Sequence, residues 1–300
     1  MKTKHLLLIC LSCFIASLFS CQKDFTAPDN ITARPDSAIV VGGDSNYLDR
    51  IYYISNLDTT YITKYYYDNL KRVIKMTSVN LSLNNNTDSV LYFYNSNDTI
   101  PFKSNGGYSY PSPTGLVSHY DNIYYTYQNN LRVKDSILEY FNTIPSFRKT
   151  IITYSYLQNK IFSITKSYQT NLPTDLGIIS NIDTATIDIN RNLISAIHYI
   201  PAIPSGYEIF NSTFTYDNKP NPFKRISNYH TLFIIPNVTE TTVEEMQSKN
   251  NLLTANQTYS SGYNLNLNGK YIYNLNGFPR QITDSSFGIV EKTIFVYKAL

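Results

Sequence analysis

One tyrosine-rich unit recurs along most of this 300-residue chain and constrains its fold more than any other feature. A copy consists of an aromatic residue, a polar residue and a second tyrosine, then Asp or Asn residues, then an apolar and basic return; Phe214–Ile226 is the clearest example. The first six copies lie about 30 residues apart, which is typical of repeated supersecondary units, and the last gap is about two such periods. The anchors of the copies are Tyr67, Tyr94, Tyr127, Tyr156, Ile189, Tyr216 and Tyr273. Alternating side chains around Asp/Asn turns predict that each copy is a β-hairpin.

The composition also favours an all-β domain. The chain holds 28 Tyr and 15 Phe but only 11 Gly, and tyrosine, Thr and Ile favour pleated, half-buried strands. We predict a single β-repeat domain over 46–300, a large antiparallel meander of hairpins that forms a strongly curved sheet or partial barrel. A two-sheet sandwich is the alternative, since so many strands seldom stay in one open sheet. The last strand, Thr293–Tyr297, is expected to close or edge the sheet.

One short helix is expected near 242–248. Thr241 and Glu244 have the spacing of a capping box, and Lys249 places a positive charge at the end of the last turn. We expect this helix to dock on the sheet.

The N-terminus has the layout of an export signal. Two lysines precede an apolar run, Leu6–Phe19, which is too short to cross a bilayer as a stable helix. Leu18–Cys21 resembles a bacterial lipobox. The resemblance implies that residues 1–20 are a lipoprotein signal peptide and that Cys21 carries the lipid. Residues 21–45, rich in Asp, Pro, Thr and Ala, are then a lipidated, flexible tether.

The segment after the cysteine points to the cell envelope. Gln22–Asp24 resembles the signal that sends lipoproteins of Bacteroidetes to the cell surface. Cys10, Cys13 and Cys21 are the only cysteines, so the mature domain would hold no disulfide and would be stabilised by its core. We predict an exported outer-membrane lipoprotein, with the exposed leaflet and the oligomeric state left open.

Two further resemblances concern the domain itself. The repeats resemble degenerate copies of the tyrosine-aspartate (Rhs-like) repeats of large bacterial shell-forming surface proteins, which build β-hairpin sheets. Two C-terminal signatures resemble those of Bacteroidetes secreted lipoproteins of unknown function. These signatures comprise Tyr216, Asp217, Asn218, Lys219, Pro220, Asn221 and Pro222 in the first, and Lys249, Asn250 and Asn251 in the second. We interpret the pair as a structural lock between a loop and the end of the expected helix.

The residues give little support for catalysis or for a metal site. His119, His198 and His230 stand singly, without His-x-His or His-Glu-x-x-His spacing, so we predict no metal and no cofactor. Ser118–Asp121 holds the residue types of a hydrolytic triad, but neighbours on an extended chain point apart, and we interpret the segment as a loop. His198 is expected to face solvent on a strand. The formal charge falls from +3 to about +1 when the two signal lysines leave, which argues against nucleic acid as a partner.

Exposed tyrosines provide the remaining candidates for binding. Residues 106–113 are interpreted as a long loop, on which an exposed ring could stack on a sugar. The candidate glycan contacts are therefore Tyr108, Tyr110 and Tyr120. A second pattern, Asp followed by Ser or Thr and an apolar residue, resembles the O-glycosylation acceptor of Bacteroidetes. It occurs at Ser37, Ser89, Thr99, Ser136 and Thr184; the alternative is an ordinary turn leading into a strand.

Together these features predict a lipid-anchored cell-envelope protein that is not an enzyme and that has a surface-binding or structural role. Its partners would be the membrane, through the lipid, and a glycan or another envelope protein. One alternative is a carbohydrate-binding protein that uses exposed tyrosines. The other is a hydrolase with a carboxylate pair that sequence alone does not single out.

Overall fold

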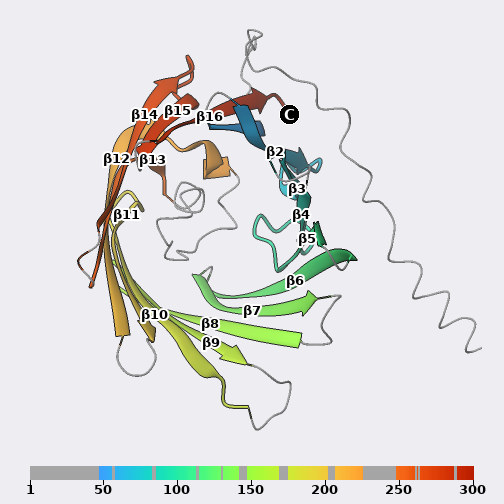
Figure 1. Cartoon of the computed structure of the whole chain (residues 1–300), viewed down its shortest axis with the longest axis vertical. Coiled ribbons are helices and arrows are strands. Elements are labelled where there is room, and N and C mark those ends of the chain that lie inside the picture. Colours follow the sequence, from blue (N-terminus) through green and yellow to red (C-terminus); the bar gives the residue numbers. More distant parts are fainter. Residues whose placement is uncertain are drawn as a thin grey trace, which may run out of the picture. The chain divides into compact units, whose positions relative to one another are not determined.

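Sixteen antiparallel strands form a closed barrel in which each strand pairs with its sequence neighbours and β16 returns to pair with β1 (Figure 1). This computed structural model describes residues 47–300 apart from 56–57, 83–85, 113–114, 130, 142–146, 169–174, 202–206, 226–247, 261, 263 and 287–288. The strands are β1 (Tyr47–Ser55), β2 (Asp58–Tyr67), β3 (Val73–Asn80), β4 (Asn86–Phe93), β5 (Lys103–Ser112), β6 (Gly115–Gln128), β7 (Leu131–Phe141), β8 (Phe147–Leu157), β9 (Lys160–Tyr168), β10 (Ile178–Ile187), β11 (Leu193–Pro201), β12 (Tyr207–Pro220), β13 (Asn250–Tyr259), β14 (Asn264–Tyr273), β15 (Pro279–Ser286) and β16 (Ile289–Lys298).

The all-β hairpin meander is thus confirmed, and the sheet closes more completely than the predicted partial barrel. The sandwich alternative is wrong, because the pairing of β16 with β1 makes one continuous sheet without edges. A short 3-10 helix, η1 (Pro222–Arg225), follows β12, whereas the expected helix at 242–248 falls almost wholly outside the described residues. No helix in the described part of the chain is long and apolar enough to cross a membrane.

Side chains alternate sharply between the two faces of the wall. On β14, Leu265 and Leu267 are buried, whereas Asn264, Asn266 and Asn268 are exposed. The buried set points into the barrel, where it forms two apolar clusters. One cluster includes Phe223 of η1, whose ring meets that of Phe295 edge-on at 6.2 Å. The repeat unit therefore encodes one hairpin of the barrel, with an apolar inner face and a polar outer face.

The recurring tyrosine has a specific structural role. A register shift, the mark of a β-bulge, occurs near one end of several strand pairs, and a bulge leaves ladder groups unpaired. Tyrosine hydroxyls donate to the carbonyls beside these bulges at 2.6–2.7 Å: Tyr67 to Leu48, Tyr94 to Val73, Tyr156 to Arg132, Tyr271 to Leu252 and Tyr297 to Pro279. Because a buried carbonyl needs a hydrogen-bond partner, the repeated tyrosine stabilises each bulge.

Two segments interpreted as loops are strands instead. Residues 103–112 form β5, which pairs with both β4 and β6, and residues 118–121 lie within β6. Gly107 suggested a loop, but it lies against the ring of Tyr120 across the strand pair, where a Cβ would approach the ring to 3.0 Å. Gly107 therefore makes room for a neighbouring aromatic ring rather than marking a turn.

Candidate functional site

The two ends of the barrel are built differently. At one end lie the turns that follow even-numbered strands, among them 68–72, 95–101, 188–192 and 274–278; we call it the Asx end, because Asp or Asn begins these turns. The chain enters β1 at this end, at Tyr47. The opposite end holds the connections that follow odd-numbered strands.

The Asx-end turns share one geometry. The Oδ1 atom of Asp68 accepts the N–H groups of residues 70 and 72, both at 2.9 Å, and Asn274 Oδ1 does the same for residues 276 and 278 at 3.0 Å. Asp188 Oδ1 accepts the N–H of Asn192 at 2.8 Å. The fourth residue of each turn has a positive φ: Lys71 62°, Arg191 67° and Gly277 79°. A short polar side chain that closes its own turn explains why Asp or Asn follows the tyrosine.

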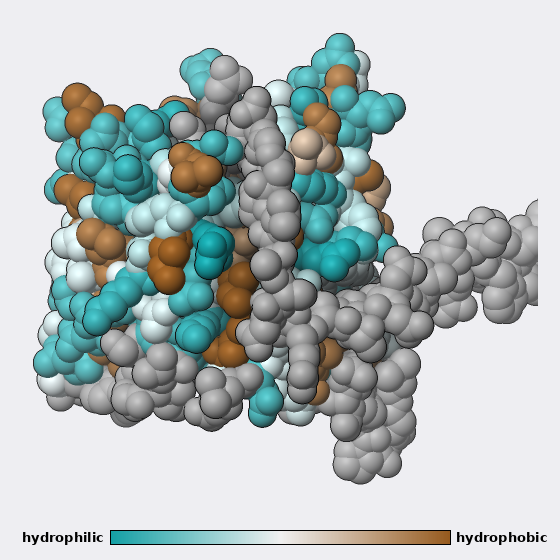
Figure 2. All heavy atoms as spheres, turned by 90° about the horizontal axis from the view of Figure 1, so that it is seen from above, coloured by the Kyte–Doolittle hydropathy of each residue, from teal (hydrophilic) through white to brown (hydrophobic). Residues whose placement is uncertain are grey.

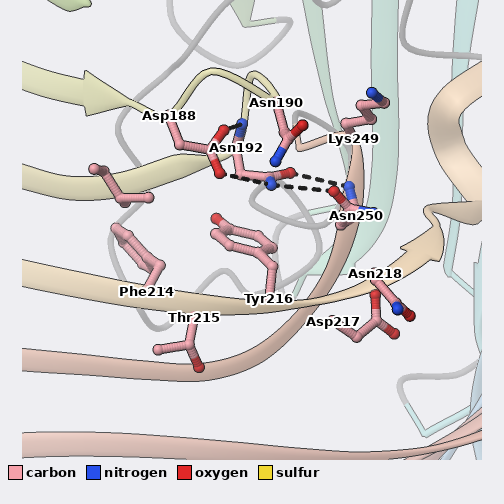
Figure 3. Close-up of a pocket in the computed structure, with 11 residues that line it drawn as sticks. Asp188, Asn190, Asn192, Phe214, Thr215, Tyr216, Asp217, Asn218, Lys249 and Asn250 are labelled. Atoms are coloured by element: carbon pink, nitrogen blue, oxygen red, sulfur yellow. Dashed lines mark hydrogen bonds between the residues drawn. The ribbon is translucent and has the colours of Figure 1, made fainter.

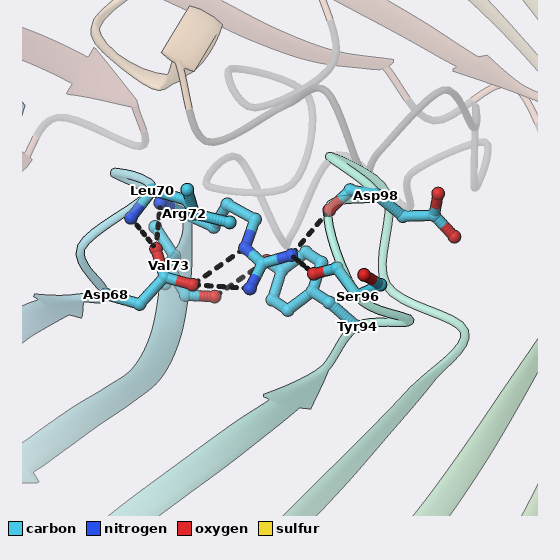
Figure 4. Close-up of polar contacts among 7 residues, drawn as sticks. All are labelled: Asp68, Leu70, Arg72, Val73, Tyr94, Ser96 and Asp98. Carbon is cyan, nitrogen blue, oxygen red and sulfur yellow. Dashed lines mark hydrogen bonds and ion pairs between the residues drawn. The ribbon is translucent and has the colours of Figure 1, made fainter.

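Arg72 joins two neighbouring turns of the Asx end (Figure 4). Its Nε donates to Asp68 Oδ2 at 2.7 Å, and its Nη1 donates to the carbonyls of Ser96 and Asp98 at 2.7 and 2.8 Å. The guanidinium also lies over the ring of Tyr94, 4.5 Å from its centroid. These contacts use the donors of Arg72 within the protein, so we interpret the group as structural.

A pocket of about 430 Å³ also opens at the Asx end, between the turn 188–192 and residues 214–218 (Figure 3). The Asn192 amide donates to Asp188 Oδ2 at 3.0 Å and to Asn250 Oδ1 at 3.1 Å, and its oxygen accepts the Asn250 N–H at 3.0 Å. Both amide hydrogens of Asn192 are therefore used inside the protein. The polar side chains of this pocket bond to one another and connect the turn 188–192 to Asn250. We therefore interpret them as structural rather than as a ligand site.

The structure brings the two C-terminal signatures together. Asn251 Nδ2 donates to Asp217 Oδ2 at 3.0 Å, Asn250 Nδ2 donates to the Lys219 carbonyl at 3.0 Å, and the Asn221 N–H donates to the Lys249 carbonyl at 3.1 Å. Tyr216 and Asn218 lie beside them on the pocket wall. These bonds join residues far apart in sequence, as a structural lock requires, and that role remains our hypothesis.

Apolar and basic side chains protrude from the Asx end. Leu70 and Leu157 are more than half exposed, and Ile189 and Leu275 are fully exposed. Among the described residues of this end that are exposed and charged, Asp98 is the one acid. The exposed basic residues are Lys71, Lys160, Arg191, Lys219, Lys249 and Arg280. Protruding apolar tips among basic residues are typical of a surface that meets anionic lipid.

Two buried polar networks lie inside the wall. Arg132 pairs with both carboxylate oxygens of Asp135, and Tyr154 donates to Asp135 Oδ2 at 2.8 Å. Burial, with the Asp135 charge beside it, raises the pKa of Tyr154 well above its ordinary value. The guanidinium and the carboxylate thus neutralise each other in the interior, so removing either one would leave an uncompensated buried charge.

The second network corrects the expectation for His198. This histidine is buried rather than solvent-facing, and its Nδ1 lies 2.8 Å from Asp183 Oδ1. Ser163 donates to the other carboxylate oxygen of Asp183 at 2.8 Å. The aspartate therefore stands between serine and histidine, whereas nucleophilic catalysis needs the histidine between the other two. This set of residue types is not arranged as a hydrolytic triad.

Near the opposite end, His119, Asp121 and Glu139 point inward from β6 and β7, and one ligand atom of each lies within 4.8 Å of the others. Burial raises the pKa of the Asp121 carboxyl above its ordinary value; His119 opposes this shift and Glu139 adds to it. Sequence reasoning missed the group because it treated 118–121 as a loop. The signal was a histidine and an aspartate two residues apart, which share a face once the segment is a strand.

The predicted glycan contacts do not share a surface. Tyr108 faces inward beside His119, with ring centroids 4.7 Å apart, whereas Tyr120 faces outward over Gly107. Tyr110 is on β5, and its side chain is outside the described part of the structure. A single stacking platform therefore cannot contain both Tyr108 and Tyr120.

The predicted modification sites are dispersed. Ser89, Ser136 and Thr184 lie on the outer faces of β4, β7 and β10, and Thr99 lies in the exposed connection after β4. Ser37 and the lipidation site Cys21 fall outside the described residues. O-glycosylation and lipidation remain predictions.

No protein-family model matches this sequence, and neither does any curated protein. The chain is similar to a porin-like protein from Bacteroides vulgatus, with a TM-score of 0.48 and 10% identity, covering 86% of this chain and 100% of that one. It is also similar to a porin-like protein from Bacteroides uniformis, with a TM-score of 0.32 and 11% identity, covering 85% of this chain and 98% of that one. Both TM-scores are below 0.5, so neither likeness bears on the function or location of this chain.

Proposed function

We propose that this chain is an exported, lipid-anchored envelope protein whose barrel stands in water on the membrane surface, with its Asx end against the lipid. In this orientation the opposite end is presented to a partner, and the protein acts by binding rather than by catalysis. The observation that carries the proposal is the contrast between a polar outer wall and an Asx end with protruding apolar and basic side chains.

The outer wall supports a location in water. Barrels that span a membrane carry an outward apolar band about 25 Å tall. The exposed, outward positions of β12, β13 and β14 are instead mostly polar, and Ile272 is the apolar one among those that the structure describes. The polar ones are Asn211, Thr213, Thr215, Asn218, Lys219, Asn256, Thr258, Asn264, Asn266, Asn268 and Lys270. Other strands of the wall carry exposed apolar side chains such as Leu91, Tyr124 and Ile164. On the part of the molecule that Figure 2 shows in colour, apolar residues lie in small groups among hydrophilic ones. Side-chain amides lose their water partners in hydrocarbon, which makes such a wall costly to embed.

Charge supports the orientation. When half-buried and exposed charges are counted alike, acids outnumber bases near the opposite end. The acids there are Asp58, Asp88, Asp121, Glu139, Asp175, Glu208, Asp284 and Glu291, and the bases are Arg148, Lys149, Lys166 and Lys292. At the Asx end the acids Asp49, Asp68, Asp98, Asp188 and Asp217 are outnumbered by the bases Arg50, Lys71, Arg72, Lys160, Arg191, Lys219, Lys249, Arg280 and Lys298. Anionic head groups attract the Asx end and repel an acidic surface. The predicted tether ends at the same place, because β1 begins at Tyr47 on the Asx end.

The hydrolase alternative has one observation in its favour, since Asp121 and Glu139 lie within 4.8 Å of each other. Retaining glycosidases hold their carboxyl groups about 5–5.5 Å apart on either side of the scissile bond. These two acids instead project from neighbouring strands of one wall with His119 between them, so both approach a ligand from the same side. The arrangement favours binding, and assays on polysaccharide substrates test the alternative.

Vesicle flotation of a Cys21→Ser chain tests the orientation without the contribution of the lipid. We expect this chain to float with anionic vesicles and not with neutral ones. Ile189→Asp combined with Leu275→Asp places charges at two apolar tips of the Asx end and should abolish flotation. The matched control is Leu176→Asp with Ile178→Asp, two residues that are 84% and 64% exposed near the opposite end, and it should float like the parent.

Equal loss of flotation in both double variants, or no loss in either, would overturn the orientation.

The lipid anchor is tested separately in cells. The wild-type chain should fractionate with the outer membrane, and Cys21→Ser should release it into the soluble fraction. A membrane-bound Cys21→Ser chain that resists carbonate extraction would show that the barrel wall itself is embedded.

A further inference from the structure

We propose that His119, Asp121 and Glu139 form a binding site for a divalent transition-metal ion of the zinc class near the opposite end of the barrel. The site is independent of how the barrel sits on a membrane. Its ligands are one imidazole nitrogen and two carboxylate oxygens, with at least one coordination position left for water or for a group of a bound partner.

The register of two strands brings the three residues together. His119 and Asp121 are two positions apart on β6, so both project from its inner face. Glu139 of β7 is the direct cross-strand partner of Asp121. The ligands therefore come from the rigid wall rather than from a loop, which holds them in place before any ion arrives.

The distances suit a shared ion. His119 Nε2 lies 3.1 Å from Asp121 Oδ1 and 3.9 Å from Glu139 Oε1. Zinc binds nitrogen and oxygen ligands at about 2.0–2.2 Å, so two ligands of one ion are roughly 3–3.5 Å apart. The Asp121 contact lies within that range, and the glutamate needs only a small side-chain adjustment to reach it.

The hydrogen bonding of His119 is the second and independent observation. The residue is only 6% exposed, yet neither of its ring nitrogens makes a hydrogen bond, and neither does the buried Asp121 Oδ1. The 3.1 Å contact between them lacks hydrogen-bond geometry even though the atoms are close. Buried polar atoms are nearly always partnered. Atoms that converge without bonding to each other are explained by an ion between them.

The surrounding groups set the charge and shape of the site. Arg148 Nε faces Glu139 Oε2 at 3.5 Å, while Oε1 of the same carboxylate faces His119. The arginine therefore holds one glutamate oxygen away from the ion. The rings of Tyr108 and Phe141 lie 4.7 and 4.4 Å from the His119 ring and fix its plane.

The donor set indicates the class of ion. Imidazole suits zinc and its neighbours among the transition metals, whereas Ca²⁺ and Mg²⁺ prefer oxygen-only cages with more ligands. Affinity at nitrogen and oxygen sites also rises from Mn²⁺ to a maximum at Cu²⁺, and Zn²⁺ binds more tightly than Mn²⁺. We therefore expect Zn²⁺ to bind more tightly than Mn²⁺, and Ca²⁺ not to compete.

Titration calorimetry with ZnCl₂ on the full chain, purified without a histidine tag and stripped with a chelator, tests the site. We expect one equivalent of Zn²⁺ to bind. His119→Gln and Asp121→Asn should each lower the affinity by roughly 100-fold or more, since loss of even an outer-sphere partner weakens metal binding by about 10–100-fold. Glu291→Gln, a carboxylate outside the cluster, is the matched control and should bind as the parent does.

Two measurements keep the test decisive if a variant folds poorly. Co²⁺ bound to the wild-type chain should give the visible absorption of a nitrogen- and oxygen-ligated site, and Zn²⁺ should displace it. Arg148→Gln frees the second glutamate oxygen and should tighten binding several-fold. Absence of a one-equivalent Zn²⁺ isotherm, or the same affinity in His119→Gln, Asp121→Asn and the parent, would overturn the proposal.

Discussion

The two ends of the barrel use similar residue types to opposite effect. At the Asx end, Asp68 and Asn274 close their own turns, and Arg72 bonds to two neighbouring turns. Near the opposite end, the buried atoms His119 Nε2 and Asp121 Oδ1 lie 3.1 Å apart without a hydrogen bond. An oxygen that accepts the N–H groups of its own turn stabilises a frame, whereas an imidazole with no hydrogen bond at either nitrogen is available to a ligand.

This difference shows which parts of the barrel the repeat unit does not specify. Every copy contributes an Asp or Asn turn to the Asx end, and all but the copy at Ile189 also contribute a tyrosine, so that end is built from what the copies share. The cluster on β6 and β7 is built from residues that no other copy carries at the same place. Function is therefore expected where the copies diverge, and the following experiments test that division.

The largest expected effect is at the buried ion pair of β7. Asp135→Asn leaves the Arg132 guanidinium buried without its counter-charge, and breaking such a pair costs about 3–5 kcal/mol. Urea unfolding should show this loss. Asp98→Asn, an exposed acid of the Asx end, is the control and should stay within about 0.5 kcal/mol of the parent. A loss below about 1 kcal/mol for Asp135→Asn would mean that the pair does not stabilise the frame.

Alkaline pH should weaken the tyrosine frame next. Burial raises the pKa of Tyr156 to about 12, and it also raises the pKa values of Tyr94, Tyr127 and Tyr273. An unfolded tyrosine titrates near 10. The folded chain therefore holds these protons more tightly, so their contribution is complete below about pH 10 and is lost as pH rises towards 12. The urea midpoint should fall across this window, and a flat profile would contradict the assignment.

A single tyrosine should have a smaller effect. Tyr156→Phe removes the donor to the Arg132 carbonyl, at 2.7 Å in the parent, and an unsatisfied carbonyl beside a bulge costs roughly 1–2 kcal/mol. Tyr120→Phe, on the outer wall, is the matched control and should leave the free energy of unfolding unchanged. Equal effects for the two substitutions would show that the bulge contact contributes nothing particular.

The smallest effect is expected near the opposite end. Because burial raises the pKa of Asp121, its charged form is disfavoured in the folded, metal-free chain. Asp121→Asn should therefore leave the stability of that form unchanged or slightly higher. If it instead costs more than about 1 kcal/mol, Asp121 belongs to the frame and the two ends do not differ as described.

Sequence patterns predicted much of the frame for clear reasons. Alternating apolar and polar residues specify which face of a strand is buried, and Asp or Asn after tyrosine specifies where each hairpin turns. Both signals are local, so the all-β hairpin meander and the presence of a final strand at Thr293–Tyr297 followed from them. Glycine and proline were misleading in β5, because a glycine that accommodates the ring of Tyr120 looks the same in sequence as one that forms a turn.

The sequence by itself determined the alternation, the turns and the period of the repeat, because each depends on neighbours within a few residues. Closure of the sheet was decided only by the tertiary structure, since it depends on the twist accumulated over sixteen strands. The proximity of His119 and Asp121 to Glu139 was likewise decided only by the tertiary structure. It arises from cross-strand register, and register is set by the whole wall rather than by any one segment.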